Sequence, residues 1–414
     1  MASWMDGGSG SFLTRCASPV AKRPRSMSAG PMSTSSSSRA MSDVLPGDRL
    51  ETARLRRGMT TAAAARALGV TPRTYRRYEQ DGAPVRQADN LATAFDFPRR
   101  FFVRDGDIRL DASEAIFRAG RRAPDAAKQA AVAVGRCGVD VDRYIRRRFV
   151  LPEVDLPDVS GHTPRTAARL LRDRWSLGDA PLPNLVQLCE SRGIRVHGLP
   201  PSAYAVDAYS CWYDGDPYIF LARRRTPEGA RFDIAHELGH LVMHRGPSSS
   251  EDREVEADEF ASEFLLPRTA LAAMVPRHPG LRDILRVRAA YRASAMATAV
   301  SLHRAGFLSD YAYRAVCRTL AGKGFRSSEP GGMGAYERSR VFSTVFSPDT
   351  PGALSVASVA DDLGIPRDDV HALILDTRLQ AVSGTPGPSP GSGPPRRELV
   401  PGAPADRPAL RVIR

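Results

Sequence analysis

Residues 231–245 read RFDIAHELGHLVMHR and contain an H-E-x-x-H motif, in which Glu237 lies between His236 and His240. Because four residues make close to one helical turn, both imidazoles share a helix face and can bind one divalent metal ion. Glu237 lies beside that metal without joining it, so its carboxylate can take a proton from a water that the metal activates. The apolar residues lie on the opposite face, as in a helix packed into a core. They are Ile234, Ala235, Leu238, Leu241 and Val242.

A catalytic zinc ion usually has three protein ligands, and residues 254–261 (EVEADEFA) offer the third. Glu254 and Asp258 are one turn apart, so Glu254 can bind the metal while Asp258 hydrogen-bonds the outer nitrogen of a ligand histidine. Glu256 is the alternative ligand, but it lies about 200° around the helix from Glu254, so only one of them can face the metal. Glu254 is favoured because it brings Asp258 to the same face. The pattern predicts a zinc site made by the two motif histidines and Glu254.

His244 extends the histidine face by another turn. Its helical rise of about 12 Å from His236 is too large for both rings to bind one zinc ion. His244 is therefore not expected to be a ligand.

The segments AHELGHLVMH (235–244) and EVEADEFASEFLLP (254–267) resemble the ImmA/IrrE family of zinc metallopeptidases. A later piece, GFRSSEP (324–330), is also similar, and the resemblance covers the chain from about residue 45 to residue 378. It implies a zincin-like fold, a Zn²⁺ cofactor and endopeptidase activity. It also implies that the substrates are repressor proteins.

Residues 46–103 have the spacing of a helix-turn-helix. Thr60 precedes a short second helix, Gly69 lies in a tight turn, and Thr71 followed by Pro72 starts a third helix that ends near residue 80. Threonine is a favoured N-cap residue, and proline fits the first helical position. This arrangement predicts a helix-turn-helix whose third helix is exposed.

The third helix carries arginines that can bind guanine edges. The stretch LGVTPRTYRRYEQDGAPV (68–85) resembles the Cro/XRE repressor family. By that resemblance the two arginines named below face bases of double-stranded DNA, while Thr61 and Thr71 hold phosphates. The DNA-binding residues that we expect are Thr61, Thr71, Arg73, Thr74 and Arg77. The alternative is a helical protein-interaction domain with a basic face.

A hairpin is predicted before the metal motif, because Asp214-Gly215 separates two apolar runs at 209–213 and 217–221. A sheet edge beside a metallopeptidase site can hold an extended substrate by backbone pairing, and this hairpin is the natural candidate for that edge.

The composition restricts the class of protein. The five cysteines are odd in number, scattered and without a C-x-x-C pair, which favours a reducing cytoplasm over a disulfide framework or a cysteine zinc site. No apolar run is long enough to cross a membrane, so no membrane partner is expected. The net charge of +13 favours a polyanionic partner.

The chain is therefore predicted to be multidomain: an all-α helix-turn-helix domain, then an α+β zincin-like metallopeptidase domain with a helical C-terminal region. The expected segments are a disordered tail (1–43), the helix-turn-helix domain (44–105), a helical connector (106–160), the metallopeptidase domain (161–330), a helical cap (331–380) and a second disordered tail (381–414).

These features predict a transcriptional regulator fused to a zinc-dependent endopeptidase that cleaves a repressor. The main alternative is a transcription factor whose zincin-like domain is a sensor or dimerisation module with little turnover. A toxin–antitoxin or phage module is a third reading. The sequence leaves the oligomeric state open, with a homodimer as one possibility.

Arg73→Ala and Arg77→Ala are each expected to weaken binding at the preferred DNA site by roughly 1–3 kcal/mol and to relax base preference there. Thr61→Ala is expected to weaken binding to all sequences alike, because phosphate contacts carry no base information. Titration against preferred and base-substituted duplexes measures both effects. Failure of the wild-type chain to bind any duplex at low salt would favour the protein-interaction alternative.

Overall fold

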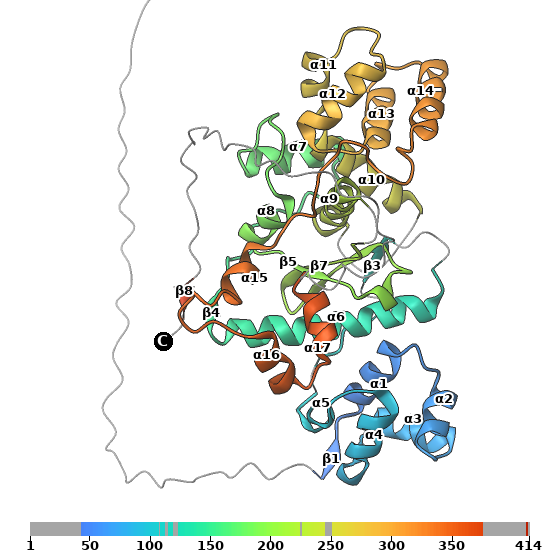
Figure 1. Cartoon of the computed structure of the whole chain (residues 1–414), viewed down its shortest axis with the longest axis vertical. Helices are drawn as coiled ribbons and strands as arrows, with labels where there is room; N and C mark the ends of the chain where they lie inside the picture. The colour runs from blue at the N-terminus through green and yellow to red at the C-terminus, as the bar shows by residue number, and fades with distance from the viewer. Residues whose placement is uncertain are drawn as a thin grey trace, which may run out of the picture. The chain divides into compact units, whose positions relative to one another are not determined.

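The computed structural model describes residues 43–375, apart from positions 107, 112–114, 119–122, 224–225 and 245–250, together with a short strand at 411–412 (Figure 1). The predicted tails therefore lie outside the described residues, except for Asp43 and that strand.

Short helices and a two-stranded ribbon make up the N-terminal region. They are β1 (Val44–Leu45), α1 (Gly47–Arg56), α2 (Thr61–Ala67), α3 (Pro72–Asp81), β2 (Ala83–Pro84), η1 (Val85–Gln87), α4 (Ala88–Phe95) and α5 (Arg99–Val103). The ribbon is antiparallel.

The local signals of the helix-turn-helix are confirmed. Thr60 Oγ1 accepts a hydrogen bond from the Ala63 amide, and Thr71 Oγ1 accepts one from the Thr74 amide, both at 3.1 Å. Gly69 has a φ of 66°, the left-handed conformation that the turn between α2 and α3 requires. The capped helices then start where the sequence places them.

The remaining elements form a mixed α/β domain and its helical extension. They are β3 (Ile116–Arg118), α6 (Asp125–Arg146), β4 (Phe149–Val150), α7 (Pro164–Arg174), α8 (Leu185–Ser191), β5 (Arg195–Gly198), η2 (Pro201–Ala203), β6 (Ala208–Tyr213), β7 (Asp216–Leu221), α9 (Pro227–Met243), α10 (Glu251–Leu265), α11 (Arg268–Met274), α12 (Leu281–Tyr291), α13 (Ala295–Arg304), α14 (Asp310–Gly322), α15 (Arg340–Val345), α16 (Val356–Leu363), α17 (Arg367–Leu373) and β8 (Arg411–Val412).

The central sheet has the strand order β3-β6-β7-β5, and β8 pairs separately with β4. β6 and β7 form the predicted hairpin, with Asp214 and Gly215 at φ values of 53° and 82°. Two consecutive positive φ angles are typical of the type I′ turn that matches the twist of hairpin strands. β5 is parallel to β7, whereas β3 is antiparallel to β6.

A helix covers each face of the sheet, and successive side chains of β6 point alternately toward the two helices. On one face of β6, Ser210 and Trp212 hydrogen-bond to α9. On the other face, the Tyr209 hydroxyl donates to the Ala131 carbonyl of α6 at 3.1 Å. The order of layers is therefore α6, sheet, α9, and α9 carries the metal motif (Figure 1).

Glycines allow α6 to lie close to the sheet. A Cβ at Gly135 would come within 2.0 Å of the Tyr209 hydroxyl, and one at Gly138 within 2.8 Å of the Phe220 ring. These two positions of α6 therefore leave room for the aromatic side chains that cover the face of β6 and β7.

The N-terminal region also packs on α6. Arg49 of α1 forms a buried ion pair with Asp140 of α6, and Arg104 Nη1 lies 3.4 Å from the same carboxylate. A second buried pair joins Arg56 of α1 to Asp369 of α17, with 2.5 Å between Nη2 and Oδ1. The segment expected to be a helical connector, 106–160, thus holds a helix that contacts both regions, and it also contains strands β3 and β4.

Two glutamates in the segment after α14 form ion pairs with arginines of α9 and α12. Glu329 pairs with Arg288 of α12 at 3.0 Å and accepts a hydrogen bond from the first amide of α13 at 3.1 Å. Glu337 forms a buried ion pair with Arg231 in the first half of α9. The helix that carries the metal motif is therefore anchored by charge pairing as well as by its apolar contacts.

Asp140→Asn is expected to lower the free energy of unfolding by about 3 kcal/mol, because it leaves two arginines beside α6 without their buried counter-charge. Urea denaturation measures the change. Asp361→Asn is the matched control, because its ion pair with Arg367 is exposed and contributes less than about 1 kcal/mol. Equal losses in the two variants would contradict this account.

Candidate metal centre and DNA-binding surface

α9 is enclosed over most of its length. It begins at Thr226, whose hydroxyl accepts a hydrogen bond from the Gly229 amide at 3.1 Å, and Pro227 occupies the first helical position. His236, Glu237 and His240 each expose no more than 1% of their surface. The helix is thus buried on both sides, against the sheet and against α10, so its polar residues need specific partners.

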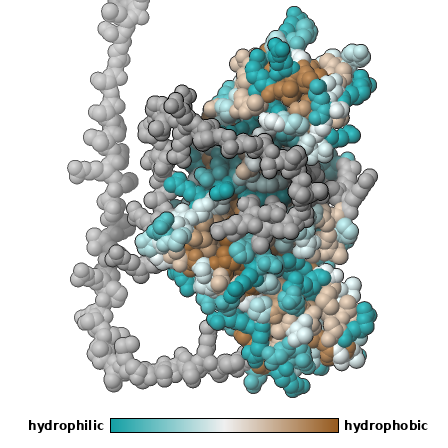
Figure 2. Space-filling model, in the orientation of Figure 1, coloured by the Kyte–Doolittle hydropathy of each residue, from teal (hydrophilic) through white to brown (hydrophobic). Residues whose placement is uncertain are grey.

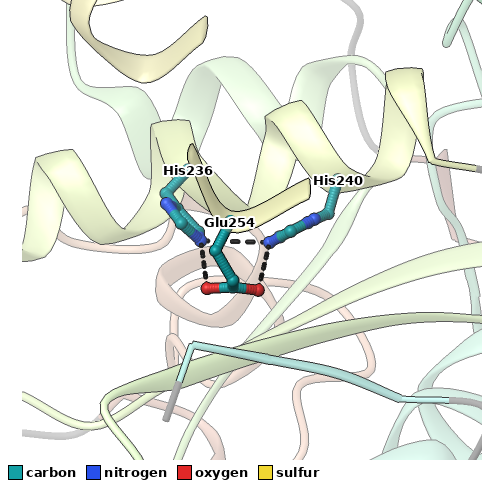
Figure 3. Close-up of side chains that lie close together, drawn as sticks. All are labelled: His236, His240 and Glu254. Atoms are coloured by element: carbon teal, nitrogen blue, oxygen red, sulfur yellow. Dashed lines mark hydrogen bonds and ion pairs between the residues drawn. The ribbon is translucent and has the colours of Figure 1, made fainter. Parts of the chain in front are cut away.

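Three side chains converge between α9 and α10 (Figure 3). The Nε2 atoms of His236 and His240 are 3.0 Å apart. The Glu254 carboxylate faces both rings, with 3.2 Å from Oε1 to His240 Nε2 and 3.5 Å from Oε2 to His236 Nε2. In the described part of the chain, no other group of His, Cys, Asp and Glu side chains is close enough to hold an ion.

The outer nitrogens of both rings are engaged elsewhere. His236 Nδ1 lies 2.9 Å from Asp258 Oδ1, which is the position that the sequence predicts for Asp258. His240 Nδ1 lies 2.9 Å from His244 Nδ1. When these outer atoms carry the ring protons, the inner Nε2 atoms present their lone pairs to the Glu254 carboxylate.

The cluster fits a zinc ion. Zinc bonds of about 2.0–2.1 Å at tetrahedral angles separate two ligand atoms by about 3.3–3.4 Å. The separations in the cluster are 3.0, 3.2 and 3.5 Å. The two Nε2 atoms and the two carboxylate oxygens are all acceptors, and at such distances they repel one another unless a proton or a cation lies between them. The residues present therefore suit the metal that the H-E-x-x-H pattern implies.

The protonation states favour the same interpretation. Burial lowers the pKa of His240 to about 4 and also lowers the pKa of His244, so both rings are neutral near pH 7. Burial raises the pKa of Glu254, but the two motif histidines that face its carboxylate lower that pKa to about 2 overall. Neutral imidazoles and an ionised carboxylate are the forms that bind metal.

Glu237 follows His236 on α9, is completely buried, and accepts a hydrogen bond from Ser210 Oγ at 2.6 Å. Ser210 has no motif of its own, and the sequence analysis does not identify it. The available signal is the alternation along β6, which places Ser210 on the same face as Trp212 and opposite Tyr209. The hydrogen bond fixes one oxygen of the carboxylate that the sequence assigns to proton transfer.

Gly239 sets the distance between the two helices. A Cβ at this position would lie 2.9 Å from the Phe260 ring of α10, which is closer than side chains tolerate. The absence of a side chain lets Phe260 rest directly on α9. That approach brings Glu254 and Asp258, on the same helix as Phe260, within reach of the histidines.

The structure contradicts the prediction that the hairpin offers the substrate-binding edge of the sheet. The outer edge of β6 is paired with β3, with Ile116 opposite Ser210, and the other edge of the hairpin is paired with β5. Neither hairpin strand is therefore an edge strand. Among the described residues, the outermost strand at the β6 side is β3, which comes from a segment predicted to be helical.

The predicted DNA-reading face is exposed. On α3, Tyr75 and Tyr78 point into the core, whereas Arg73 and Arg77 are exposed. Of the threonines, Thr71 is exposed at the helix start, and Thr61 and Thr74 are half-buried. On the face drawn in Figure 2, hydrophilic side chains cover much of the region of α1 to α5. The amphipathic third helix leaves both predicted arginines available to a polyanion.

Family comparisons agree with this organisation. Residues 47–100 match a family model described as a helix-turn-helix domain. Residues 189–303 match the M78 peptidase model, described as an IrrE N-terminal-like domain. The fold and site thus define a protein with a DNA-binding domain followed by a metallopeptidase-type domain. The latter is IrrE-like, as the sequence resemblance implies, and the predicted multidomain fold class is confirmed. No curated protein matches the chain in a sequence search.

In the part of the chain that the structure describes, no helix is both long enough and apolar enough to cross a membrane.

Gly239→Ala is expected to weaken zinc binding at least tenfold although alanine is the better helix former, because the added methyl group displaces Phe260 and moves Glu254 away. Chelator competition measures the zinc affinity. Gly322→Ala is the control, because a Cβ there meets nothing within 4 Å. Unchanged affinity in Gly239→Ala would show that the close approach of the helices does not set the site.

Proposed function

We propose that this protein is a transcriptional regulator whose second domain is a zinc-dependent endopeptidase, and that its substrate is a repressor-type protein. The observation that carries this proposal is the cluster of buried His236 and His240 with Glu254, and Glu237 next to His236 on the same helix, inside a domain that matches a peptidase family.

The chemistry divides between the metal and the chain. His236, His240 and Glu254 would hold Zn²⁺, which supplies Lewis acidity that polarises the scissile carbonyl and makes an attacking water more acidic. Glu237 accepts the proton of that water and passes it to the leaving amine. Ser210 orients Glu237 through the 2.6 Å hydrogen bond to one of its carboxylate oxygens.

An extended substrate segment would bind along the outer edge of β3. No other strand among the described residues pairs with that edge. The pairing of Ile116 with Ser210 places β3 one strand away from the hydrogen-bond partner of Glu237. Backbone hydrogen bonds to an added strand position a peptide with little dependence on its side chains. This mode suits a protein substrate that presents an unfolded or looped segment.

The helix-turn-helix domain would determine where in the cell the peptidase acts. It would bring the catalytic domain to DNA, where a repressor is concentrated, and cleavage would then release the repressed genes. Regulators of this type often bind paired half-sites, so a homodimer with two α3 helices in successive major grooves fits the same proposal.

Glu237→Gln is the decisive variant, because glutamine keeps the shape and the hydrogen bond from Ser210 but cannot accept a proton. Cleavage of repressors from the same genome should fall by roughly 10²–10⁴-fold, while zinc content and DNA binding stay at the wild-type level. The assay is incubation of the purified, zinc-loaded protein with each candidate repressor, followed by identification of the cut.

Reporter expression separates this proposal from a sensor or dimerisation role for the second domain. Genes under the cleaved repressor should stay silent in cells that carry Glu237→Gln. Arg73→Ala serves as the comparison, because it removes a DNA contact and leaves the metal cluster intact. A normal response in zinc-loaded Glu237→Gln cells would rule out the enzymatic role.

A further inference from the structure

We propose that His244 and Glu256 form a relay that orients His240 and strengthens it as a metal ligand. This inference rests on the metal site of the proposed function. It gives a role to two residues that do not bind the metal themselves: His244, the C-cap residue of α9, and Glu256, the alternative to Glu254 as a ligand in the sequence.

His236 and His240 of α9 lie in a row with His244, the C-cap residue of the helix. The ring centroids of His236 and His240 are 4.7 Å apart, and those of His240 and His244 are 5.1 Å apart. His240 Nδ1 lies 2.9 Å from His244 Nδ1, and His244 Nε2 lies 2.9 Å from Glu256 Oε2. The spacing of four residues between successive histidines thus builds a continuous hydrogen-bonded path from the metal cluster to α10.

Metal binding fixes the direction of every hydrogen bond in this path. His240 must offer a bare Nε2 to the metal, so its ring proton resides on Nδ1 and is donated to His244. His244 therefore accepts at Nδ1, and its own proton resides on Nε2, where it is donated to Glu256. An ionised carboxylate at the end of the path can only accept, so the two ends are consistent with one arrangement of protons.

Neither relay residue is placed to bind the ion itself. The Nδ1 atom of His244 faces the outer nitrogen of His240, and its Nε2 atom faces Glu256. Glu256 is engaged with His244, whereas Glu254 lies between the two inner Nε2 atoms. The ion-binding group found among the described residues includes neither His244 nor Glu256.

The relay parallels the direct contact on the other ligand. Asp258 accepts from His236 at 2.9 Å, so each ligand histidine is backed by a carboxylate of α10, once directly and once through a second imidazole. Glu256 lies about 200° around its helix from Glu254 and so comes from a different face of α10. The 6% exposed His244 ring fills the space between that face and His240.

A carboxylate behind a ligand histidine stabilises the partial positive charge that the ring acquires on bonding to a metal, and it fixes the ring orientation. Removal of such a partner typically costs 10–100-fold in metal affinity. Loss of the relay also leaves His240 Nδ1–H buried without an acceptor, since His240 has no exposed surface.

The test is a set of full-length variants whose zinc dissociation constant is measured by chelator competition and whose Co²⁺-substituted form is examined by visible absorption. His244→Phe keeps a ring but removes both hydrogen bonds, and we expect at least a tenfold weaker zinc affinity and a shifted Co²⁺ spectrum. His244→Asn keeps an acceptor for His240 and should recover part of the loss. Glu256→Gln keeps a hydrogen-bond acceptor without charge and should give a smaller loss than His244→Phe.

Glu259→Gln is the matched control, because Glu259 is exposed on the same helix as Glu256. This substitution is expected to leave the zinc affinity and the Co²⁺ spectrum unchanged. Wild-type affinity and spectrum in His244→Phe would overturn the relay while leaving the metal site intact. Complete loss of zinc in Glu256→Gln would also overturn it, because Glu256 would then be a ligand. If the wild-type chain binds no zinc, the metal site and the relay both fail. Should His244→Phe not fold, His244→Asn and Glu256→Gln decide the matter.

Discussion

Gly239 and Phe260 meet where α9 packs against α10, and the geometry of the metal cluster depends on that contact. Two of the proposed ligands and the proposed base come from one helix, while the third proposed ligand and the carboxylates of Asp258 and Glu256 come from the other. Zinc tolerates errors of only a few tenths of an ångström in ligand position. The spacing must therefore be set by packing rather than by flexible side chains, and a ring lying on a glycine provides a contact that cannot be compressed further.

The sheet packs against a helix on each face, and this packing imposes a second constraint. Ser210 points from β6 toward Glu237, whereas its neighbour Tyr209 points toward α6, so the alternation of one strand serves both the reactive site and the supporting layer. α6 is also the surface on which α1 packs, through Arg49 and Asp140. The DNA-binding region thus packs, through a buried ion pair, on the same helix that covers one face of the sheet of the metallopeptidase-type domain.

Features set by neighbouring residues could be predicted from the sequence, and features set by distant pairing could not. Thr60 and Thr71 cap helices, and Asp214-Gly215 makes a turn, because each acts within a few residues. By contrast, β3 exists only because its backbone pairs with β6, about ninety positions away, and its sequence has no alternation that favours a strand. Spacing along one helix likewise rules out His244 as a ligand, but its contact with Glu256 depends on how two helices pack.

Hydrogen bonds to the buried polar atoms explain how the folded chain accommodates the proposed metal site in its interior. The outer nitrogens of both histidines have partners, Asp258 for His236 and His244 for His240, and Glu237 accepts a hydrogen bond from Ser210. The atoms that face inward are acceptors close to one another, so the metal-free fold retains an unfavourable electrostatic energy there. A cation removes that cost only in the folded state, because the unfolded chain does not bring the three ligands together. Metal binding and folding of the α9–α10 pair are consequently linked, and the energy that positions the ligands is recovered when the ion binds.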